Sequence, residues 1–239
     1  MTRSLSAARR RVRCALILGV LVLCLPLAAL HAEAPAVDPG INDHYYDADV
    51  ERWRLIFESP GREIFDQRLR IVHAARVRPG MAVADVGAGT GFMAMLFARA
   101  VGPEGKVYAV DISPSFVEGI RARSREYRVE NVEAIVNDQR DTRLPAESVD
   151  LVFVSDTYHH FEYPQDMLRS IYQALRPGGE LVVIDFHRIP GRSSAWVLSH
   201  VRLGREEAIS EIEAAGFELI GEERFLRENY YLRFRKPAG

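Results

Sequence analysis

The chain has 239 residues and a formal net charge of -2, a length that suits one α/β domain and is too short for two of ordinary size. Five of its 31 basic residues lie in residues 1–32, where there is no acidic residue, so the rest of the chain carries 26 basic and 33 acidic residues. This acidic balance excludes nucleic acid as an expected partner, because neutralising phosphates requires a basic surface.

Residues 1–32 have the pattern of an export signal. An arginine-rich start leads into the apolar, uncharged run CALILGVLVLCLPLAAL, residues 14–30, and Leu30-His31-Ala32 offers a small-residue cleavage site. The run is at the short limit for a spanning helix. Arginines before it and acidic residues after it predict that the following chain lies outside the cytoplasmic membrane. We therefore expect a signal peptide or an uncleaved anchor, a periplasmic or extracytoplasmic domain, and membrane contact only through this segment.

Both cysteines, Cys14 and Cys24, belong to this leader. The remaining chain therefore has no thiol for a disulfide, a nucleophile or a metal ligand. Its histidines show no spacing typical of a metal site, and we expect no metal.

The next segment is predicted to be a linker followed by helices. Residues 33–46 are polar, with two prolines and a glycine, which indicates a linker. Residues 47–57 and 62–77 place apolar side chains at helical spacing. We expect a single domain over residues 47–239 that begins with helices within 47–77.

From Met81 onwards the pattern changes to short apolar strands. The strand-like runs are MAVADVGA, KVYAVDI, VEAIVND, VDLVFVSDTY and GELVVIDF, and helical stretches at 92–101, 114–127 and 164–175 separate them. Strands and helices in alternation predict a parallel sheet with helices on both faces, and continuous apolar strands suit such a buried sheet. A helix in REEAISEIEAAGF and two further strands predict a closing antiparallel hairpin.

The loop DVGAGTGF, residues 85–92, follows the first predicted strand. A dinucleotide-binding loop has the pattern G-x-G-x-x-G, but here the third glycine comes one residue early. No lysine or arginine lies between Arg78 and Arg99 to meet a phosphate, and Asp85 places a carboxylate beside the turn. The loop thus favours a ligand without phosphates, although a purely structural turn remains an alternative.

Three further predicted strands end in polar residues. Asp111 ends the second strand, where a carboxylate can accept hydrogen bonds from ribose hydroxyls. Asp138 ends the third predicted strand, where it either faces an adenine amine or caps a solvated turn. Ser155 begins the stretch SDTYHHFEYP, which follows the fourth predicted strand.

Together these stretches resemble the class I S-adenosylmethionine-dependent methyltransferases, notably the small-molecule group that includes the ubiquinone/menaquinone-biosynthesis C-methyltransferases. The resemblance covers residues 70–186 and is carried by VADVGAGTGF, VYAVDIS, VNDQRDTRLPAESVDLVFVSDTYHHF and ALRPGGELVVIDF. It implies an α/β fold with a doubly wound, Rossmann-like sheet of seven strands in the order 3-2-1-4-5-7-6, the last strand antiparallel.

The resemblance also implies S-adenosylmethionine as the cofactor and assigns residues to it. The methionine part would lie against Asp85, Gly87, Gly89 and Gly91. The ribose would be held by Asp111 and Ile112, and the adenine by Asp138 and Gln139. Ser155 and Asp156 would approach the amino-acid moiety or the acceptor.

The implied reaction is methyl transfer to a small or lipid-like acceptor outside the cytoplasm. A base is needed only for a hydroxyl or acidic-carbon acceptor, and the candidates are His159, His160 and His187. Aromatic residues of the N-terminal helices either cover the acceptor or pack in the core: Tyr45, Tyr46, Trp53 and Phe57. A non-catalytic exported protein that binds an S-adenosyl nucleoside is the alternative function. No sequence feature identifies the acceptor or the oligomeric state.

Overall fold

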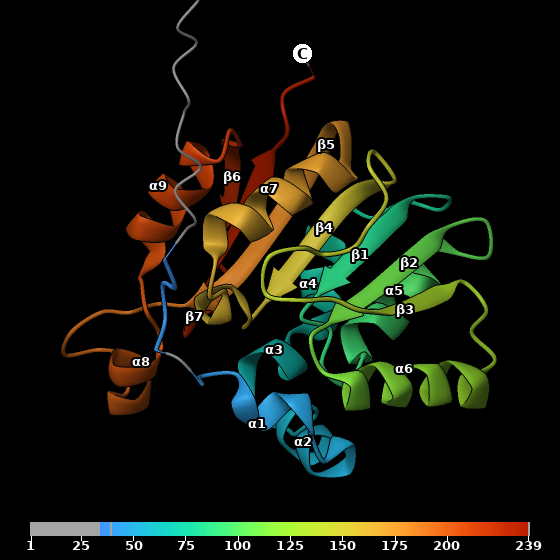
Figure 1. Cartoon of the computed structure of the whole chain (residues 1–239), viewed down its shortest axis with the longest axis horizontal. Coiled ribbons are helices and arrows are strands. Elements are labelled where there is room, and N and C mark those ends of the chain that lie inside the picture. The colour runs from blue at the N-terminus through green and yellow to red at the C-terminus, as the bar shows by residue number, and fades with distance from the viewer. Residues whose placement is uncertain (1–33, 39, 239) are drawn as a thin grey trace, which may run out of the picture. The chain divides into compact units, whose positions relative to one another are not determined.

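A seven-stranded sheet in the order β3-β2-β1-β4-β5-β7-β6 forms the centre of the fold (Figure 1). The structure, a computed structural model, describes residues 34–38 and 40–238, so the predicted signal segment lies outside the described residues. The strands are β1 (Ala82–Val86), β2 (Lys106–Asp111), β3 (Val132–Val136), β4 (Val149–Ser155), β5 (Leu175–Phe186), β6 (Glu218–Glu223) and β7 (Asn229–Arg235). β7 runs antiparallel to both β5 and β6, and the other pairs are parallel. The predicted strand order and closing hairpin are confirmed.

Helices cover both faces of the sheet because the strand residues are apolar on both sides. In β4, Phe153 packs into one core cluster with Phe97 and Ile71, while its neighbours Val152 and Val154 belong to the other. Successive side chains of a strand point to opposite faces, so each face carries its own apolar layer. The helices of the sheet layers are α5 (Phe92–Val101), α6 (Pro114–Tyr127), α7 (Pro164–Ala174) and α9 (Arg205–Ala214).

The N-terminal segment adds four short helices; the first three lie beside the carboxyl ends of the strands, and the fourth packs against α5 on one face of the sheet (Figure 1). They are α1 (Asp43–Tyr46), α2 (Val50–Phe57), α3 (Glu63–Asp66) and α4 (Arg68–Ala74). The helix predicted over 62–77 is therefore divided at Gln67. Sequence reasoning also missed the 3₁₀ turn η1 (Tyr158–His160) and helix α8 (Ala195–His200).

The segment predicted as a linker over 33–46 contacts the domain, beginning with the Ala36 N–H, which donates to the Glu162 carbonyl at 2.7 Å. Asn42 is buried, and its Nδ2 donates to the His160 carbonyl at 3.1 Å and to the Glu162 carboxylate at 3.2 Å. These long-range contacts leave no local pattern in the sequence, which explains the difference. No helix in the described part of the chain is long and apolar enough to cross a membrane.

Candidate functional site

The glycine turn after β1 is held in backbone conformations that only glycine adopts easily. Gly87, Gly89 and Gly91 have φ angles of +78°, +52° and +76°. A Cβ added to Gly87 would lie 2.3 Å from the Thr157 side chain, and one on Gly91 would lie 2.7 Å from Ile120. Gly87 therefore permits a close approach of the first and fourth strand ends, whereas Gly91 permits helix packing.

We expect Gly87→Ala to destabilise the chain and to abolish ligand binding at this turn. The left-handed conformation alone costs about 1–2 kcal/mol for a residue with a Cβ, and the clash with Thr157 adds to it. Gly178→Ala is the matched control, because Gly178 has φ +76° but nothing within 4 Å of its added Cβ. Thermal unfolding of both variants measures the difference, and equal losses of stability would show that the clash is relieved without cost.

Asp111, at the end of β2, fixes the glycine turn. It is buried, and its Oδ2 accepts the Gly89 N–H at 2.7 Å while its Oδ1 accepts the Ser113 N–H at 2.9 Å. Burial raises the pKa of Asp111 to about 6, although the two N–H groups oppose this. The carboxylate thus positions the turn, and its remaining lone pairs can accept from ligand hydroxyls.

Asp85 supplies a second buried carboxylate beside the same turn. Only 3% of its surface is exposed, and its Oδ2 has no hydrogen-bond partner. Burial and the nearby charge of Asp111 raise the pKa of Asp85 to about 7. Ser155 Oγ and Asn137 Oδ1 are likewise buried without a partner. Because buried polar atoms are normally paired, these atoms indicate a place for a polar, cationic ligand.

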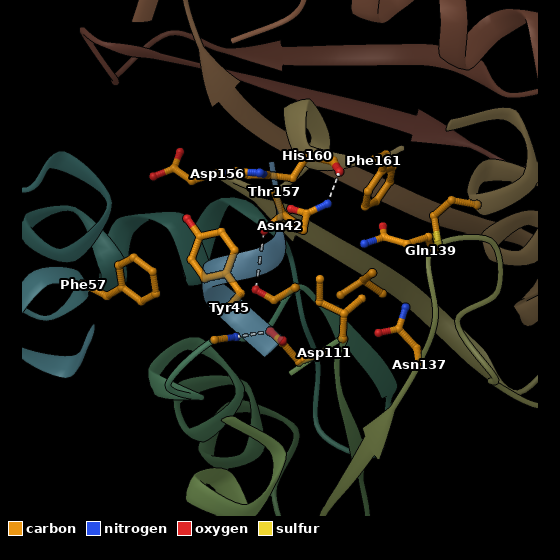
Figure 2. A pocket seen from close by; sticks show the side chains of 15 residues that line it. Asn42, Tyr45, Phe57, Asp111, Asn137, Gln139, Asp156, Thr157, His160 and Phe161 are labelled. Atoms are coloured by element: carbon orange, nitrogen blue, oxygen red, sulfur yellow. Dashed lines mark hydrogen bonds between the residues drawn. The ribbon is translucent and has the colours of Figure 1, made fainter. Parts of the chain in front are cut away.

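Two adjoining cavities open onto this edge of the sheet. The first is lined by Gly87, Gly89, Asp111, Ile112, Asn137 and Gln139, among others (Figure 2). The second is lined by residues that include Asp85, Ser155, His159, Phe186, Trp196 and His200. Tyr45, Asp156, Thr157 and His160 line both. The arrangement suits a cofactor in one cavity and a second reactant in the other.

The structure differs from the sequence prediction at the end of β3. Asp138 lines neither cavity, and its side chain is 51% exposed. Its Oδ1 accepts the N–H groups of Arg140 and Asp141, so it caps a solvated turn. Asn137 lines the first cavity instead, next to Gln139. The prediction missed Asn137 because it sought a carboxylate, although an amide also pairs with adenine.

Aromatic side chains of the N-terminal helices lie over the cavities. The Tyr45 ring centroid is 5.0 Å from that of Trp53 and 5.4 Å from that of His160. Tyr45 and Phe57 line both cavities, and Trp53 lines the second. Tyr46 is exposed, and its hydroxyl accepts from Gln139 Nε2 at 3.0 Å. Three of the four predicted aromatic residues, Tyr45, Trp53 and Phe57, therefore line the cavities, and we call these three the aromatic cover.

An ion pair anchors this cover to the glycine turn. Arg123 of α6 donates to both carboxylate oxygens of Glu58, at 2.6 and 2.9 Å, and Thr90 Oγ1 donates to the same carboxylate at 2.8 Å. The Arg123 and Glu58 side chains are only 17% and 13% exposed.

Arg123→Ala is expected to reduce the stability by about 1–3 kcal/mol, since it leaves a mostly buried carboxylate without its cation. It should also weaken ligand binding by freeing the cover. Arg54→Ala is the control, because its pair with Glu51 is exposed and contributes little. Chemical denaturation compares them, and equal effects of the two variants would exclude the anchoring role.

The structure brings together two of the three predicted histidines. His159 and His160 lie in η1 and line the second cavity, whereas His187 lines neither cavity and packs against Tyr230. His159 Nδ1 lies 2.7 Å from Asp185 Oδ1. Burial opposes protonation, but the Asp185 charge and hydrogen bond prevail and raise the pKa of His159. Burial, together with the neighbouring imidazoles, lowers the pKa of His160 to about 2, so His160 is neutral.

Asp156 has an unusual backbone conformation. Its φ is +49°, in the left-handed region that non-glycine residues rarely occupy. Its carboxylate accepts from Arg62 Nη2 and Asn229 Nδ2, each at 2.7 Å. Burial raises the pKa of Asp156 to about 6, with Arg62 opposing. The contact also means that Arg62 is engaged rather than free to meet a phosphate.

Comparisons with known proteins agree with this geometry. Residues 83–179 match the family model of a methyltransferase domain. The ubiquinone/menaquinone biosynthesis C-methyltransferase UbiE of Ectopseudomonas mendocina is 34% identical over 121 residues, which are 50% of this chain and 47% of that protein. The chain thus spans about half the length of the curated relatives it matches.

Solved structures share the fold at lower identity. A SAM-dependent methyltransferase from Aquifex aeolicus aligns over 80% of this chain and 100% of its own, with a TM-score of 0.71 and 24% identity. A possible exported protein from Bordetella parapertussis aligns over 81% of each chain, with a TM-score of 0.62 and 20% identity. The sheet order, the glycine turn with its acidic partners and the matched domain agree: residues 83–179 match a methyltransferase domain, and the chain has the fold of S-adenosylmethionine-dependent methyltransferases.

Proposed function

We propose that the chain binds S-adenosylmethionine in the first cavity and transfers its methyl group to a small or lipid-like acceptor in the second. The observation that carries the proposal is the pair of buried carboxylates, Asp85 and Asp111, at a glycine turn without a free cation. Arg62 is the only lysine or arginine among the described residues that line the two cavities, and it is paired with Asp156. A pyrophosphate would be repelled there, whereas the ammonium and sulfonium groups of the cofactor would be stabilised.

Each part of the cofactor has residues that fit it. Asp111 would accept from the ribose hydroxyls, and Asn137 and Gln139 would meet the adenine beside Ile112. Gly87 and Gly89, which line both cavities, would let the backbone approach the methionine part, whose ammonium group would reach the unpaired Oδ2 of Asp85 at the adjoining wall of the second cavity. The reaction is attack of an acceptor atom on the methyl carbon in line with the sulfur. The protein contributes mainly by aligning the two reactants.

The second cavity offers groups for the acceptor. Phe186, Trp196 and Tyr45 supply aromatic surface, which suits a ring or an apolar chain. The imidazoles of His159 and His160 lie at the same wall, where they face a polar or acidic group of the acceptor.

A turnover assay tests the proposal. The full chain is incubated with methyl-labelled S-adenosylmethionine and with phenols, quinols or an extract of membrane lipids, and S-adenosylhomocysteine is measured. We expect product with at least one acceptor class and loss of product in Asp111→Ala. Binding of the cofactor without turnover on any acceptor would instead support the non-catalytic S-adenosyl-binding function.

We also propose that the domain acts outside the cytoplasm. The arginine-rich start and apolar run of residues 1–32 support this, and the Bordetella parapertussis protein with the same fold is described as possibly exported. A fusion of residues 1–40 to a reporter that is active only after export tests it. Reporter activity outside the cytoplasm is expected, and a reporter retained inside would contradict export.

A further inference from the structure

Three imidazoles meet at one wall of the second cavity. His159 and His160 come from η1, and His200 comes from α8, forty positions later in the chain. Each offers one ring nitrogen, and these atoms all lie within 4.8 Å of one another. The sequence showed no metal-ligand spacing because His200 reaches the other two only through the packing of α8.

The separations match a tetrahedral metal site. With metal–nitrogen bonds of about 2.0–2.1 Å, two imidazole nitrogens on one tetrahedral ion lie about 3.3 Å apart, and their ring centroids about 5 Å apart. His160 Nε2 and His200 Nε2 lie 3.4 Å apart. The three pairs of ring centroids are 4.3, 5.3 and 5.0 Å apart. Small side-chain rotations would therefore bring all three nitrogens onto one ion.

The Asp185 carboxylate orients the first of these histidines. Its Oδ1 lies 2.7 Å from His159 Nδ1, and its Oδ2 accepts the His159 backbone N–H at 2.9 Å. This pairing places the proton on Nδ1 and leaves the lone pair of Nε2 free. Carboxylate–histidine–metal sites use the same arrangement. His159 is 2% exposed, and its Nε2 has no hydrogen-bond partner.

The cluster is poorly explained as packing alone. Buried polar atoms without partners cost stability, yet His159 Nε2 is of this kind. A metal ion bound to this nitrogen would give it a partner.

We propose that His159, His160 and His200 bind one divalent transition-metal cation of the zinc class, with Asp185 as the residue that positions His159. Three imidazole nitrogens suit zinc, cobalt, nickel or copper, whereas magnesium and calcium prefer oxygen ligands. Three protein ligands leave the fourth position open to the second cavity. If the proposed function holds, an acceptor oxygen such as a phenol or enol occupies that position, and the ion favours loss of its proton.

Metal titration tests the site without any methyl donor. The full chain, prepared without a polyhistidine tag and stripped with a chelator, is titrated with Zn²⁺ by calorimetry and with Co²⁺ by visible absorption. We expect one equivalent of each metal and a tetrahedral Co²⁺ spectrum. His200→Ala should reduce the affinity at least about tenfold and remove the spectrum, and Asp185→Asn should reduce the affinity about 10- to 100-fold. His200 lies at the end of a short surface helix, so its truncation leaves the sheet core intact.

His73→Ala is the control, because His73 is exposed on α4 and away from the cluster. It should bind metal as the parent chain does. Absence of stoichiometric metal binding by the parent chain would overturn the proposed metal site. Unchanged metal affinity and Co²⁺ spectrum in His200→Ala would overturn it as well. A parallel titration of the stripped chain with S-adenosylmethionine separates this outcome from failure of the proposed function, since the two ligands use different residues.

Discussion

Asp111→Ala is expected to weaken the binding of S-adenosylmethionine about 5- to 150-fold, the equivalent of about 1–3 kcal/mol. The carboxylate accepts the Gly89 and Ser113 N–H groups in the structure and would accept the ribose hydroxyls of the cofactor. Its removal leaves donors on both the protein and the ligand without partners. Calorimetric titration of the variant and the parent chain measures the change.

Asp138→Ala is the matched control for this experiment. Asp138 also follows a strand of the parallel sheet, but it caps a solvated turn outside both cavities. We expect its affinity for the cofactor to equal that of the parent chain within error. If Asp138→Ala weakened binding while Asp111→Ala did not, the ribose would have to lie at the third strand end, against the geometry described above.

Asp85→Asn is expected to stabilise the ligand-free chain at alkaline pH while weakening cofactor binding. The pKa of Asp85 is raised by burial and by Asp111 from 3.8 to about 7. The native state therefore keeps a proton that the unfolded chain has already released. Stability falls as the pH rises from about 4 to about 7, and above that range the full cost of the buried charge applies. The rise of the Asp85 pKa from 3.8 to about 7 sets an upper limit of about 4 kcal/mol on this cost.

Asp85→Asn removes the carboxylate charge and keeps the shape of the side chain. We expect Asp85→Asn to unfold at a higher temperature than the parent chain at pH 8, and at nearly the same temperature at pH 4. Asp138→Asn should unfold at a lower temperature than the parent chain at pH 8. The reason is that the N–H groups of Arg140 and Asp141 outweigh burial and lower the pKa of Asp138. Thermal unfolding across this pH range gives the comparison. Lower stability of Asp85→Asn at pH 8 would show that Asp85 is stabilised as an anion in the free chain.

The predictable part of the fold depends on patterns that are local in the sequence. The apolar strands, the helices between them and the glycine turn are each contained in a few consecutive residues. The helices predicted at 92–101 and 114–127 have these bounds in the structure. The strand order was predicted from the family resemblance, because proteins that share these motifs also share the order of their strands.

The parts that could not be predicted depend on contacts between distant segments. Asn42 binds His160 and Glu162, which are far away in the sequence, so part of a stretch with the composition of a linker is folded. His187 and His200 are equally isolated in the sequence, and only the packing of α8 places one of them at the cavity. Asn137 and Asp138 are neighbours, and the geometry of the turn, rather than residue type, selects which one faces the ligand.

Calorimetric comparison of three ligands on the full chain tests most directly whether the site binds a cationic nucleoside without phosphates. S-adenosylmethionine, S-adenosylhomocysteine and NADH are titrated separately under the same conditions. The proposed function predicts stoichiometric binding of both S-adenosyl compounds and no binding of NADH, because Asp85 and Asp111 repel its pyrophosphate. Binding of NADH in the absence of binding by either S-adenosyl compound would contradict it.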